Sequence, residues 1–295
     1  MKLILDQIPL DLGDRGLDPP TRDNQRQSPI RPFLKWAGGK YLVLDRILTA
    51  LPPGRRLLEP FTGSGVVAIN SGFETVLVAD ANADLINLYL WVKNDPDKLV
   101  TEIERLFSGD ANTRDRFDKN RADFNSTDDT FRRSALFVYL NRHCFNGLCR
   151  YNSRGKFNVP FGRYIKPLLP LDAIHRFAAA AQNIEFQQAD FREIMESAVH
   201  GDVVYCDPPY VPLSITANFT GYATEGFGPA EQIALAEAAV RLAKRGVPVV
   251  ISNHDTPWVR EIYTGAHLES FGVQRRISRD AASRGAAQEL LAIFA

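Results

Sequence analysis

The feature that most restricts the fold is a strand–loop–helix–strand pattern in the N-terminal third of the chain. Residues 55–59 are predicted to form a short strand that leads into a loop with Gly63 and Gly65, and a helix is predicted directly after this loop. A second apolar strand, residues 75–79, ends at Asp80. This order is typical of the nucleotide-cofactor half of a doubly wound α/β sheet. There, the glycines let the backbone approach the ligand and the acid accepts hydrogen bonds from ribose hydroxyls.

The glycine loop also restricts the cofactor. It lacks the third glycine of the complete dinucleotide-binding pattern, which disfavours a ligand with a pyrophosphate group. S-adenosyl-L-methionine has a ribose and no phosphate, so it fits the loop better than NAD. The α/β alternation returns after Pro170, with a helix predicted at 229–244. Further strands are predicted at 184–188, 203–206 and 247–252, followed by an antiparallel pair at 268–275 and 289–294.

The stretch Asp207-Pro208-Pro209-Tyr210 directly follows the predicted buried strand 203–206. Proline fixes φ and lacks an N–H, so two prolines turn the chain stiffly and leave carbonyl acceptors without a competing local donor. The Asp207 carboxylate and the Pro208 carbonyl would then form an acceptor pair beside the flat face of Tyr210. Such a set suits an exocyclic amine on a planar ring, because both N–H groups need acceptors while the ring is held by stacking. The alternative is a turn that caps the strand with a solvated Asp207, and the motif alone does not decide between them.

The composition is that of an ordinary globular protein, since 45% of the 295 residues are hydrophobic and 24% are charged. No apolar run reaches the length that spans a bilayer, and Asp6 interrupts the apolar residues that a signal peptide would need. Three cysteines in a chain of this length do not form a disulfide framework. They favour reduced thiols and a cytoplasmic protein without a membrane partner.

The charges are balanced overall but unevenly distributed. The formal net charge is zero, from 35 basic and 35 acidic residues, whereas residues 131–170 contain eight basic residues and no acidic one. One basic face on a neutral protein is the electrostatic footprint expected for a polyanion. The eight residues are Arg132, Arg133, Arg142, Arg150, Arg154, Lys156, Arg163 and Lys166.

Changes in composition divide the chain into parts. Residues 1–29 are polar, contain four prolines and show no hydrophobic period, so we expect a flexible extension. The α/β pattern occupies 30–93 and 171–295, and we expect these two stretches to form one domain with 94–170 inserted into it. The insertion is predicted to have helices at 97–107 and 130–142 and a loop-like middle at 109–129. A long glycine-containing loop at 213–228 is well placed to move over a site.

Two groups of residues invite other chemistry. His143, Cys144 and Cys149 lie close together in the sequence, but their spacing matches no usual zinc pattern and no fourth ligand is evident, so we expect no metal. Cys206 adjoins the acidic motif and could suggest a covalent intermediate, whereas its position inside an apolar strand favours a packed thiol. His254, at the end of a strand, is interpreted as a hydrogen-bonding residue rather than a catalyst.

Four stretches, taken together, resemble the Dam-type (D12 class) DNA adenine-N6 methyltransferase family. They are FLKWAGGK at 33–40, EPFTGSG at 59–65, NGLCRYN at 146–152 and DPPY at 207–210, and the resemblance covers 31–295. The shorter matches NVPFGRY at 158–164 and ISNHD at 251–255 add to it. The resemblance implies a seven-stranded, Rossmann-like, S-adenosyl-L-methionine-dependent methyltransferase fold, with the basic insertion as a helical target-recognition domain. It also implies methylation of adenine N6 in double-stranded DNA containing GATC, with base flipping.

The resemblance further implies roles for single residues. The catalytic set would be Asp207, Pro208, Pro209 and Tyr210. The cofactor would contact Trp36, Lys40, Glu59, Pro60, Phe61, Gly63, Gly65, Asp80, Phe191 and Asp207. DNA would contact Lys35, Phe145, Asn146, Leu148, Arg150 and Tyr164. Phe145 stands where relatives often carry Tyr, so an aromatic wedge remains without its hydroxyl, and residues 278–287 are less basic than in relatives.

Other functions stay open from the sequence. Methylation of cytosine N4, or of adenine in RNA, would draw on similar residues. A catalytically silent DNA-binding protein belongs to a different class, which the intact motif at 207–210 and both loop glycines disfavour. A nicotinamide oxidoreductase is disfavoured by the missing third glycine. No obligate protein partner is evident.

Overall fold

The computed structural model describes residues 28–210, 227–273 and 287–295. The predicted flexible extension therefore lies, up to residue 27, outside the described residues. The same holds for most of the loop predicted at 213–228 and for nearly all of the weakly basic stretch 278–287. Within the described part of the chain, none of the helices has the length and apolarity needed to cross a bilayer.

A seven-stranded mixed sheet forms the centre of the molecule, in the order β3-β2-β1-β4-β5-β7-β6. The five strands from β3 to β5 are parallel, and β7 runs antiparallel to both β5 and β6. This topology confirms the predicted doubly wound sheet with an antiparallel finish. The strands are β1 (Arg56–Glu59), β2 (Thr75–Asp80), β3 (Ile184–Gln188), β4 (Asp202–Cys206), β5 (Val249–His254), β6 (His267–Val273) and β7 (Ala287–Phe294).

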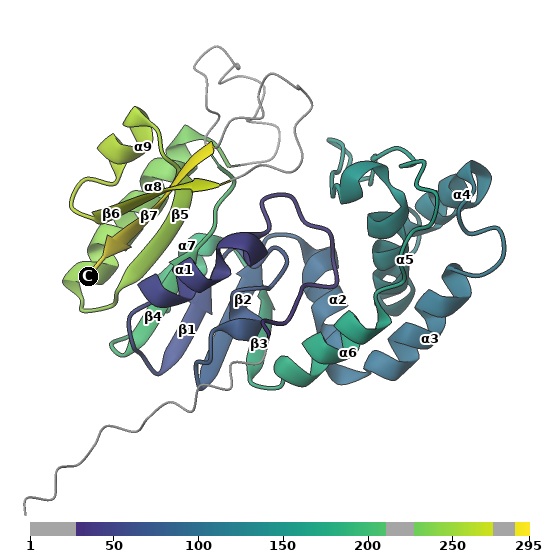
Figure 1. Ribbon diagram of the computed structural model, residues 1–295, viewed down its shortest axis with the longest axis horizontal. Coiled ribbons are helices and arrows are strands. Elements are labelled where there is room, and N and C mark those ends of the chain that lie inside the picture. The colour runs from purple at the N-terminus through teal and green to yellow at the C-terminus, as the bar shows by residue number, and fades with distance from the viewer. Residues whose placement is uncertain (1–27, 211–226, 274–286) are drawn as a thin grey trace, which may run out of the picture.

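Helices cover both faces of the sheet, which explains why its central strands read as continuous apolar runs. Successive strand residues point to opposite faces, so Leu57 joins one hydrophobic cluster and Leu58 the other. Figure 1 shows α3, α4 and α5 grouped beyond the β3 edge of the sheet. The helices are α1 (Leu44–Ala50), α2 (Ala83–Asn94), α3 (Pro96–Leu106), α4 (Arg114–Phe124), α5 (Thr130–His143), α6 (Leu171–Ala180), α7 (Phe191–Glu196), α8 (Pro229–Lys244) and α9 (Pro257–Ile262), with 3-10 turns η1 (Lys40–Val43), η2 (Ala68–Asn70) and η3 (Phe145–Gly147).

Two local predictions were wrong. The stretch 109–129 contains helix α4, because Thr113 caps it by accepting from the Arg116 N–H and because Phe117 and Phe124 are buried. Its otherwise polar sequence hides this narrow apolar stripe. The helix expected after Gly65 is only the 3-10 turn η2, which ends before a glycine with positive φ. The short helix α9, which the sequence analysis missed, is capped by Thr256.

The segment 157–163 forms no regular strand. Its only ladder contacts among the described residues are two isolated bridges, Tyr151 with Phe157 and Cys144 with Phe161. These bridges fold residues 144–161 back on themselves. Backbone hydrogen bonds hold the two arms together outside the sheet, among them Phe145 N–H to the Pro160 carbonyl and Gly162 N–H to the His143 carbonyl, both at 2.8 Å.

The basic segment is less exposed than its composition suggested. Arg132 pairs with Glu102 and Asp123. Arg133 pairs with Asp84, and Arg142 donates to the Phe33 carbonyl. All three belong to α5, whose buried face carries polar anchors as well as apolar residues. The expectation that all eight basic residues form one outer face is therefore wrong. The five that are exposed are Arg150, Arg154, Lys156, Arg163 and Lys166.

Inside the sheet, Arg56 and Asp202 form an ion pair between the first residues of β1 and β4. The fully buried Asp202 carboxylate accepts from Arg56 Nη2 at 2.6 Å and Nε at 3.0 Å, and from the Val199 N–H at 2.9 Å. Burial by itself raises the pKa of Asp202, but the hydrogen bonds from Arg56 and Val199 outweigh it and hold the pKa below its usual value. The pair therefore stabilises the register of the two strands that carry Glu59 and Asp207.

We expect Asp202→Asn to lower the free energy of unfolding by about 1–3 kcal/mol at pH 7, the range for losing a charged hydrogen bond. The pKa of Asp202 is depressed in the folded protein. Its contribution to the free energy of unfolding is therefore complete above the unfolded-state pKa of about 3.9 and is lost as the pH falls through the folded-state pKa. Urea titrations at pH 7 and between pH 5 and 3 would measure both. Glu237→Gln, in the exposed pair with Arg241 at 3.9 Å, is the control and should change stability by less than about 0.5 kcal/mol. Equal losses for the two variants would contradict a special role for the buried pair.

Candidate active site

Three carboxylates lie at the carboxyl ends of three neighbouring parallel strands. Glu59 ends β1, Asp80 ends β2 and Asp207 directly follows β4, and these strands are adjacent in the order β2-β1-β4. In open α/β sheets, ligands bind in the crevice outside the carboxyl ends of the strands. The sheet topology therefore brings together acids that are far apart in the sequence, at the edge where a ligand is expected.

The glycine loop after β1 is fixed to the neighbouring strand. Thr62 donates from its backbone N–H and from Oγ1 to the Ala79 carbonyl at 2.9 and 2.8 Å. Gly63 has φ of 48°, and a Cβ there would lie 2.9 Å from Trp36 Nε1. Gly65 has φ of 68°, and a Cβ would lie 3.1 Å from the Phe177 ring. Both glycines are thus required by their conformation and by the close approach of the Trp36 and Phe177 side chains. The predicted approach to a ligand stays a prediction.

Asp80 closes this loop. Its Oδ2 accepts from the Gly63 N–H at 3.2 Å and its Oδ1 from the Asn82 N–H at 2.9 Å. Burial raises the pKa of Asp80, whereas these two backbone hydrogen bonds lower it, with a net rise. One carboxylate therefore joins the glycine loop to the start of α2, and each oxygen keeps a lone pair for a ligand.

Glu59 is a buried acid with an unused oxygen. Glu59 is 2% exposed, and its Oε2 has no hydrogen-bond partner among the described residues. Burial raises the pKa of Glu59 well above its usual value, and the nearby charges of Asp207 and Asp80 add to this rise. A buried polar atom without a partner marks a place where a ligand can complete the hydrogen bonding. A cationic ligand group would be stabilised here.

A lysine ammonium lies against the acid of the predicted catalytic set. Lys40 Nζ is 2.9 Å from Asp207 Oδ1, donates to the Gly38 carbonyl at 2.6 Å and lies 4.5 Å from the centre of the Tyr210 ring. The Lys40 side chain is only 6% exposed and that of Asp207 is 21% exposed. Burial raises the pKa of Asp207, and the charge of Lys40 opposes this rise only in part. Asp207 and Tyr210 therefore already hold a nitrogen cation between them.

The rest of the Asp-Pro-Pro-Tyr stretch is held from β7 and α8. The Tyr210 hydroxyl donates to Glu289 Oε2 at 3.2 Å, and its ring meets His254 edge-on at 4.7 Å. The Pro209 carbonyl accepts from Gln232 Nε2 at 2.7 Å. The Pro208 carbonyl receives no donor from the described part of the chain, so it can serve as the predicted second acceptor.

An aromatic group borders the glycine loop. Phe61 and Phe191 stack with centroids 5.3 Å apart, and Phe227 meets both rings edge-on. Pro60 is buried beside this loop. Phe191 begins α7, directly after the Asp190 that caps this helix. Phe61 of the glycine loop therefore contacts Phe191 of α7, and Trp36 packs over Gly63.

The residues expected to meet DNA fall into two groups. Lys35 Nζ lies 3.9 Å from the centre of the Tyr164 ring, and a Cβ at Gly147 would lie 2.4 Å from Lys35 Cβ. Phe145 and Asn146, on the same turn, are exposed, and Asn146 has φ of 55°. These side chains gather in one place. Leu148 is half-buried against the core, and Arg150 stands apart, exposed, with Nε donating to Asn158 Oδ1 at 2.8 Å.

One side chain joins the two loops of the first group. The buried Asn141 accepts from the Lys35 N–H at 2.9 Å and donates to the carbonyls of Lys35 and Gly147 at 2.7 and 3.0 Å. Neither Asn141 nor Glu289 was predicted as a site residue. A buried amide on α5 and an acid opening the apolar run of β7 are the signals that could have found them.

The histidine and cysteines near this turn have structural partners. His143 Nδ1 contacts the Tyr139 carbonyl at 2.8 Å, and burial lowers the pKa of His143 to about 4. Cys144 Sγ donates to the Leu148 carbonyl at 3.3 Å, and Cys149 Sγ accepts from Asn82 Nδ2 at 3.5 Å. Within 28–210, 227–273 and 287–295, no group of three or more His, Cys, Asp and Glu residues could hold a metal ion.

Comparisons with known proteins agree on one family. Residues 36–277 match the family model described as D12 class N6 adenine-specific DNA methyltransferase. Proteins named DNA adenine methylase are 49% identical in Serratia marcescens (90% of this chain, 98% of that protein) and 49% identical in Escherichia coli K12 (90% and 95%). The C-terminal domain of precorrin-6Y C5,15-methyltransferase from Rhodobacter capsulatus matches with a TM-score of 0.38 at 11% identity, over 90% of this chain and 97% of that one. That similarity is too low to bear on function.

We expect the three thiols to be nearly inert in the folded protein. Burial raises the pKa of Cys144 and of Cys149 to about 12, and it raises the pKa of the fully buried Cys206 well above its usual value. Thiolate is the reactive form, so Ellman's reagent at pH 8 should label the native protein slowly and all three thiols rapidly in urea. Rapid labelling of one thiol per native chain, abolished in Cys206→Ala, would show an accessible thiolate beside Asp207.

Proposed function

Because this chain belongs to the D12 class of N6 adenine-specific DNA methyltransferases, we propose that it methylates adenine within GATC in duplex DNA, with S-adenosyl-L-methionine as methyl donor and the target base flipped out. The observation that carries the proposal is the Lys40 ammonium held between the Asp207 carboxylate and the Tyr210 ring. An amine on a flat ring would find the same acceptor and the same stacking face there.

The residues of the crevice fit the proposed methyl donor. S-adenosyl-L-methionine supplies an electrophilic methyl group on a sulfonium, together with an ammonium, a ribose and an adenine. Gly63 and Gly65 supply the positive φ angles of the loop, and Asp80 keeps acceptor capacity for ribose hydroxyls. The unpartnered Glu59 Oε2 would accept from a cationic group of the donor. Phe191 offers an apolar border for the adenine of the cofactor, beside Phe61.

The acceptor pair would act on the target amine. The lone pair of adenine N6 is delocalised into the ring, so the nitrogen is a poor nucleophile. Hydrogen bonds from N6 to Asp207 and to the Pro208 carbonyl would favour a tetrahedral nitrogen with its lone pair free for in-line attack. Tyr210, oriented by Glu289, would hold the base by stacking. Most of the rate would come from positioning and electrostatics. Lys40 would have to move aside from Asp207 as the base enters.

The DNA side of the proposal rests on the exposed turn and its neighbours. Phe145 is 40% exposed at the tip of the turn that Lys35 and Tyr164 border, which suits an apolar wedge that fills the space left by a flipped base. Lys35, Asn146 and Arg150 offer donors for base edges. Cytosine N4 could use the same acceptor pair, but the family to which the chain belongs favours adenine. We also infer a cytoplasmic enzyme, consistent with the three free cysteines.

We expect Asp207→Ala to reduce methyl transfer at least about 100-fold, the scale for losing one transition-state hydrogen bond, while folding and DNA binding persist. Incorporation of labelled methyl groups into a GATC duplex is the assay, with binding followed by fluorescence anisotropy. Asp172→Ala, an exposed acid in the first turn of α6, is the control and should leave the rate unchanged. Near-normal transfer by the Asp207 variant would overturn the mechanism.

Base reading and backbone binding can be separated with two exposed cations. Arg150→Ala should narrow the ratio of rates on GATC and single-substituted sites, because a guanidinium that reads guanine contributes about 1–3 kcal/mol of discrimination. Lys166→Ala should preserve that ratio, slow all duplexes alike and flatten the salt dependence. Methyl-transfer rates on GATC and near-cognate duplexes at two salt concentrations distinguish base reading from backbone binding. If Arg150→Ala slows every duplex by one factor, Arg150 is a backbone anchor.

A further inference from the structure

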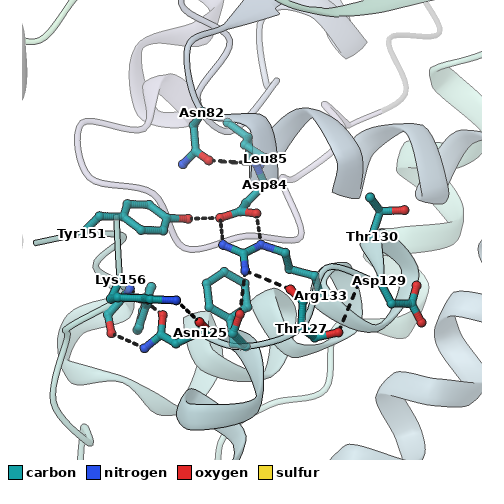
Figure 2. Close-up of polar contacts among 12 residues, drawn as sticks. Asn82, Asp84, Leu85, Asn125, Thr127, Asp129, Thr130, Arg133, Tyr151 and Lys156 are labelled. Atoms are coloured by element: carbon teal, nitrogen blue, oxygen red, sulfur yellow. Dashed lines mark hydrogen bonds and ion pairs between the residues drawn. The ribbon is translucent and has the colours of Figure 1, made fainter. Parts of the chain in front are cut away.

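The candidate cofactor site and the turn that carries Arg150 are joined by one carboxylate. Asp84, in the first turn of α2, accepts from the Tyr151 hydroxyl at 2.6 Å and from Arg133 Nη2 at 3.0 Å, both at Oδ2, while Arg133 Nε bonds Oδ1 (Figure 2). The Asp84 side chain is 12% exposed and that of Arg133 is 23% exposed. These are charge-assisted hydrogen bonds in a largely buried place, which makes them stronger than neutral ones.

A second link runs in parallel through Asn82. Its backbone N–H donates to Asp80 Oδ1, and its side-chain oxygen caps α2 by accepting from the N–H groups of Asp84 and Leu85 at 3.0 and 3.3 Å. Its Nδ2 donates weakly to Cys149 Sγ at 3.5 Å. The start of α2 thus touches the ribose-binding candidate Asp80 on one side and the residues before and after Arg150 on the other.

The turn beyond Tyr151 is held to the same support. Tyr151 bridges Phe157 and meets its ring edge-on at 6.1 Å. Asn125, just after α4, donates to the Phe157 carbonyl at 3.0 Å and accepts from its N–H at 2.7 Å. Arg133 donates to the Phe124 carbonyl at 2.6 Å while it pairs with Asp84. The exposed Arg150, whose Nε donates to Asn158 Oδ1, therefore lies on a turn whose base is fixed by Asp84 and Tyr151.

The protonation state of Tyr151 agrees with this role. Burial raises the pKa of the Tyr151 hydroxyl far above its usual value, and the neighbouring Cys149 and Asp84 add to the rise. The hydroxyl therefore stays a donor throughout the physiological range. It can hold the carboxylate without a change of charge when DNA approaches.

We propose that Asp84 and Tyr151 are positioning residues that couple cofactor occupancy at Asp80 to base reading by Arg150. A ligand that orders Asp80 also orders the start of α2, and through the Asp84–Tyr151 hydrogen bond it orders the turn that presents Arg150. Discrimination between GATC and near-cognate DNA then increases when the cofactor site is filled. This inference rests on the proposed function, because it takes Asp80 as a cofactor contact and Arg150 as a base reader.

The test is a linkage measurement on Tyr151→Phe. This variant removes one hydroxyl and leaves the ring packing and the Arg133–Asp84 pair in place. Dissociation constants for a GATC duplex and a single-substituted duplex are measured with and without sinefungin, an analogue that cannot donate a methyl group. Discrimination is the ratio of the dissociation constants for the single-substituted and GATC duplexes, and the coupling factor is the discrimination with sinefungin divided by that without it. Thermodynamic linkage requires the same factor when the affinity for sinefungin is measured in the presence of each duplex.

In the wild-type protein we expect a coupling factor of about 5 or more, the lower end of ordinary allosteric coupling. Tyr151→Phe should reduce it toward 1, while the affinity for sinefungin without DNA and the melting temperature stay close to wild type. Tyr139→Phe is the matched control. It removes a buried hydroxyl of α5 that donates to the Ala111 carbonyl at 2.6 Å, far from the link through Asp84, and it should keep the wild-type factor. Asp84→Asn should act like Tyr151→Phe, and the double variant should be no worse than either single one.

The outcomes separate the two claims. If the wild-type protein prefers GATC and Tyr151→Phe keeps the full coupling factor, the inference is wrong and the proposed function stands. If Tyr151→Phe weakens binding of both duplexes equally at an unchanged factor, the hydrogen bond is merely structural and the inference is again wrong. If the wild-type protein shows no preference for GATC with or without the analogue, the proposed target fails and the inference falls with it.

Discussion

The structure depends on a sheet whose central strands are buried on both faces. Leu57, Leu58, Val203 and Val204 have no access to water, so a carboxylate on β1 or β4 is tolerated only where the strand begins or ends. The chain places carboxylates at those ends and on the neighbouring β2. Burial is therefore the reason that Glu59, Asp80 and Asp207 meet, and also the reason that their charged forms are disfavoured. A cationic ligand, or a ligand rich in hydrogen-bond donors, is the natural complement of such an edge.

The same edge explains the place of Lys40. Three acids with raised pKa values in one crevice repel one another when ionised, and a nearly buried ammonium at Asp207 relieves part of that repulsion. The lysine comes from the short turn η1 that follows the tryptophan-containing loop, and its Nζ is also anchored on the Gly38 carbonyl. It pairs with Asp207 and lies over the Tyr210 ring, on which the proposed target base would stack.

Much of the fold followed from local patterns, whereas several site contacts did not. The parallel strands, the acids Asp80 and Asp207 at strand ends and the two loop glycines were predictable, because buried strands and left-handed turns have strong local signatures. Helix α4 was not, since two phenylalanines in a polar stretch give almost no periodic signal. The ion pairs of Arg132 and Arg133 could not be predicted either. A count of basic residues in one segment does not reveal their acidic partners, because Glu102 and Asp84 lie on other helices. Asn141 and Glu289 act through contacts across more than 70 residues of chain.

The clamp made by Asn141 has a consequence for how target choice could change during evolution. One amide fixes the Lys35 backbone and the Gly147 carbonyl together, and the Gly147 turn leaves no room for a Cβ beside Lys35. The two loops are consequently fixed to each other, and a substitution that re-aims one disturbs the other. If they read DNA as proposed, a new recognition sequence would require coordinated changes in both loops.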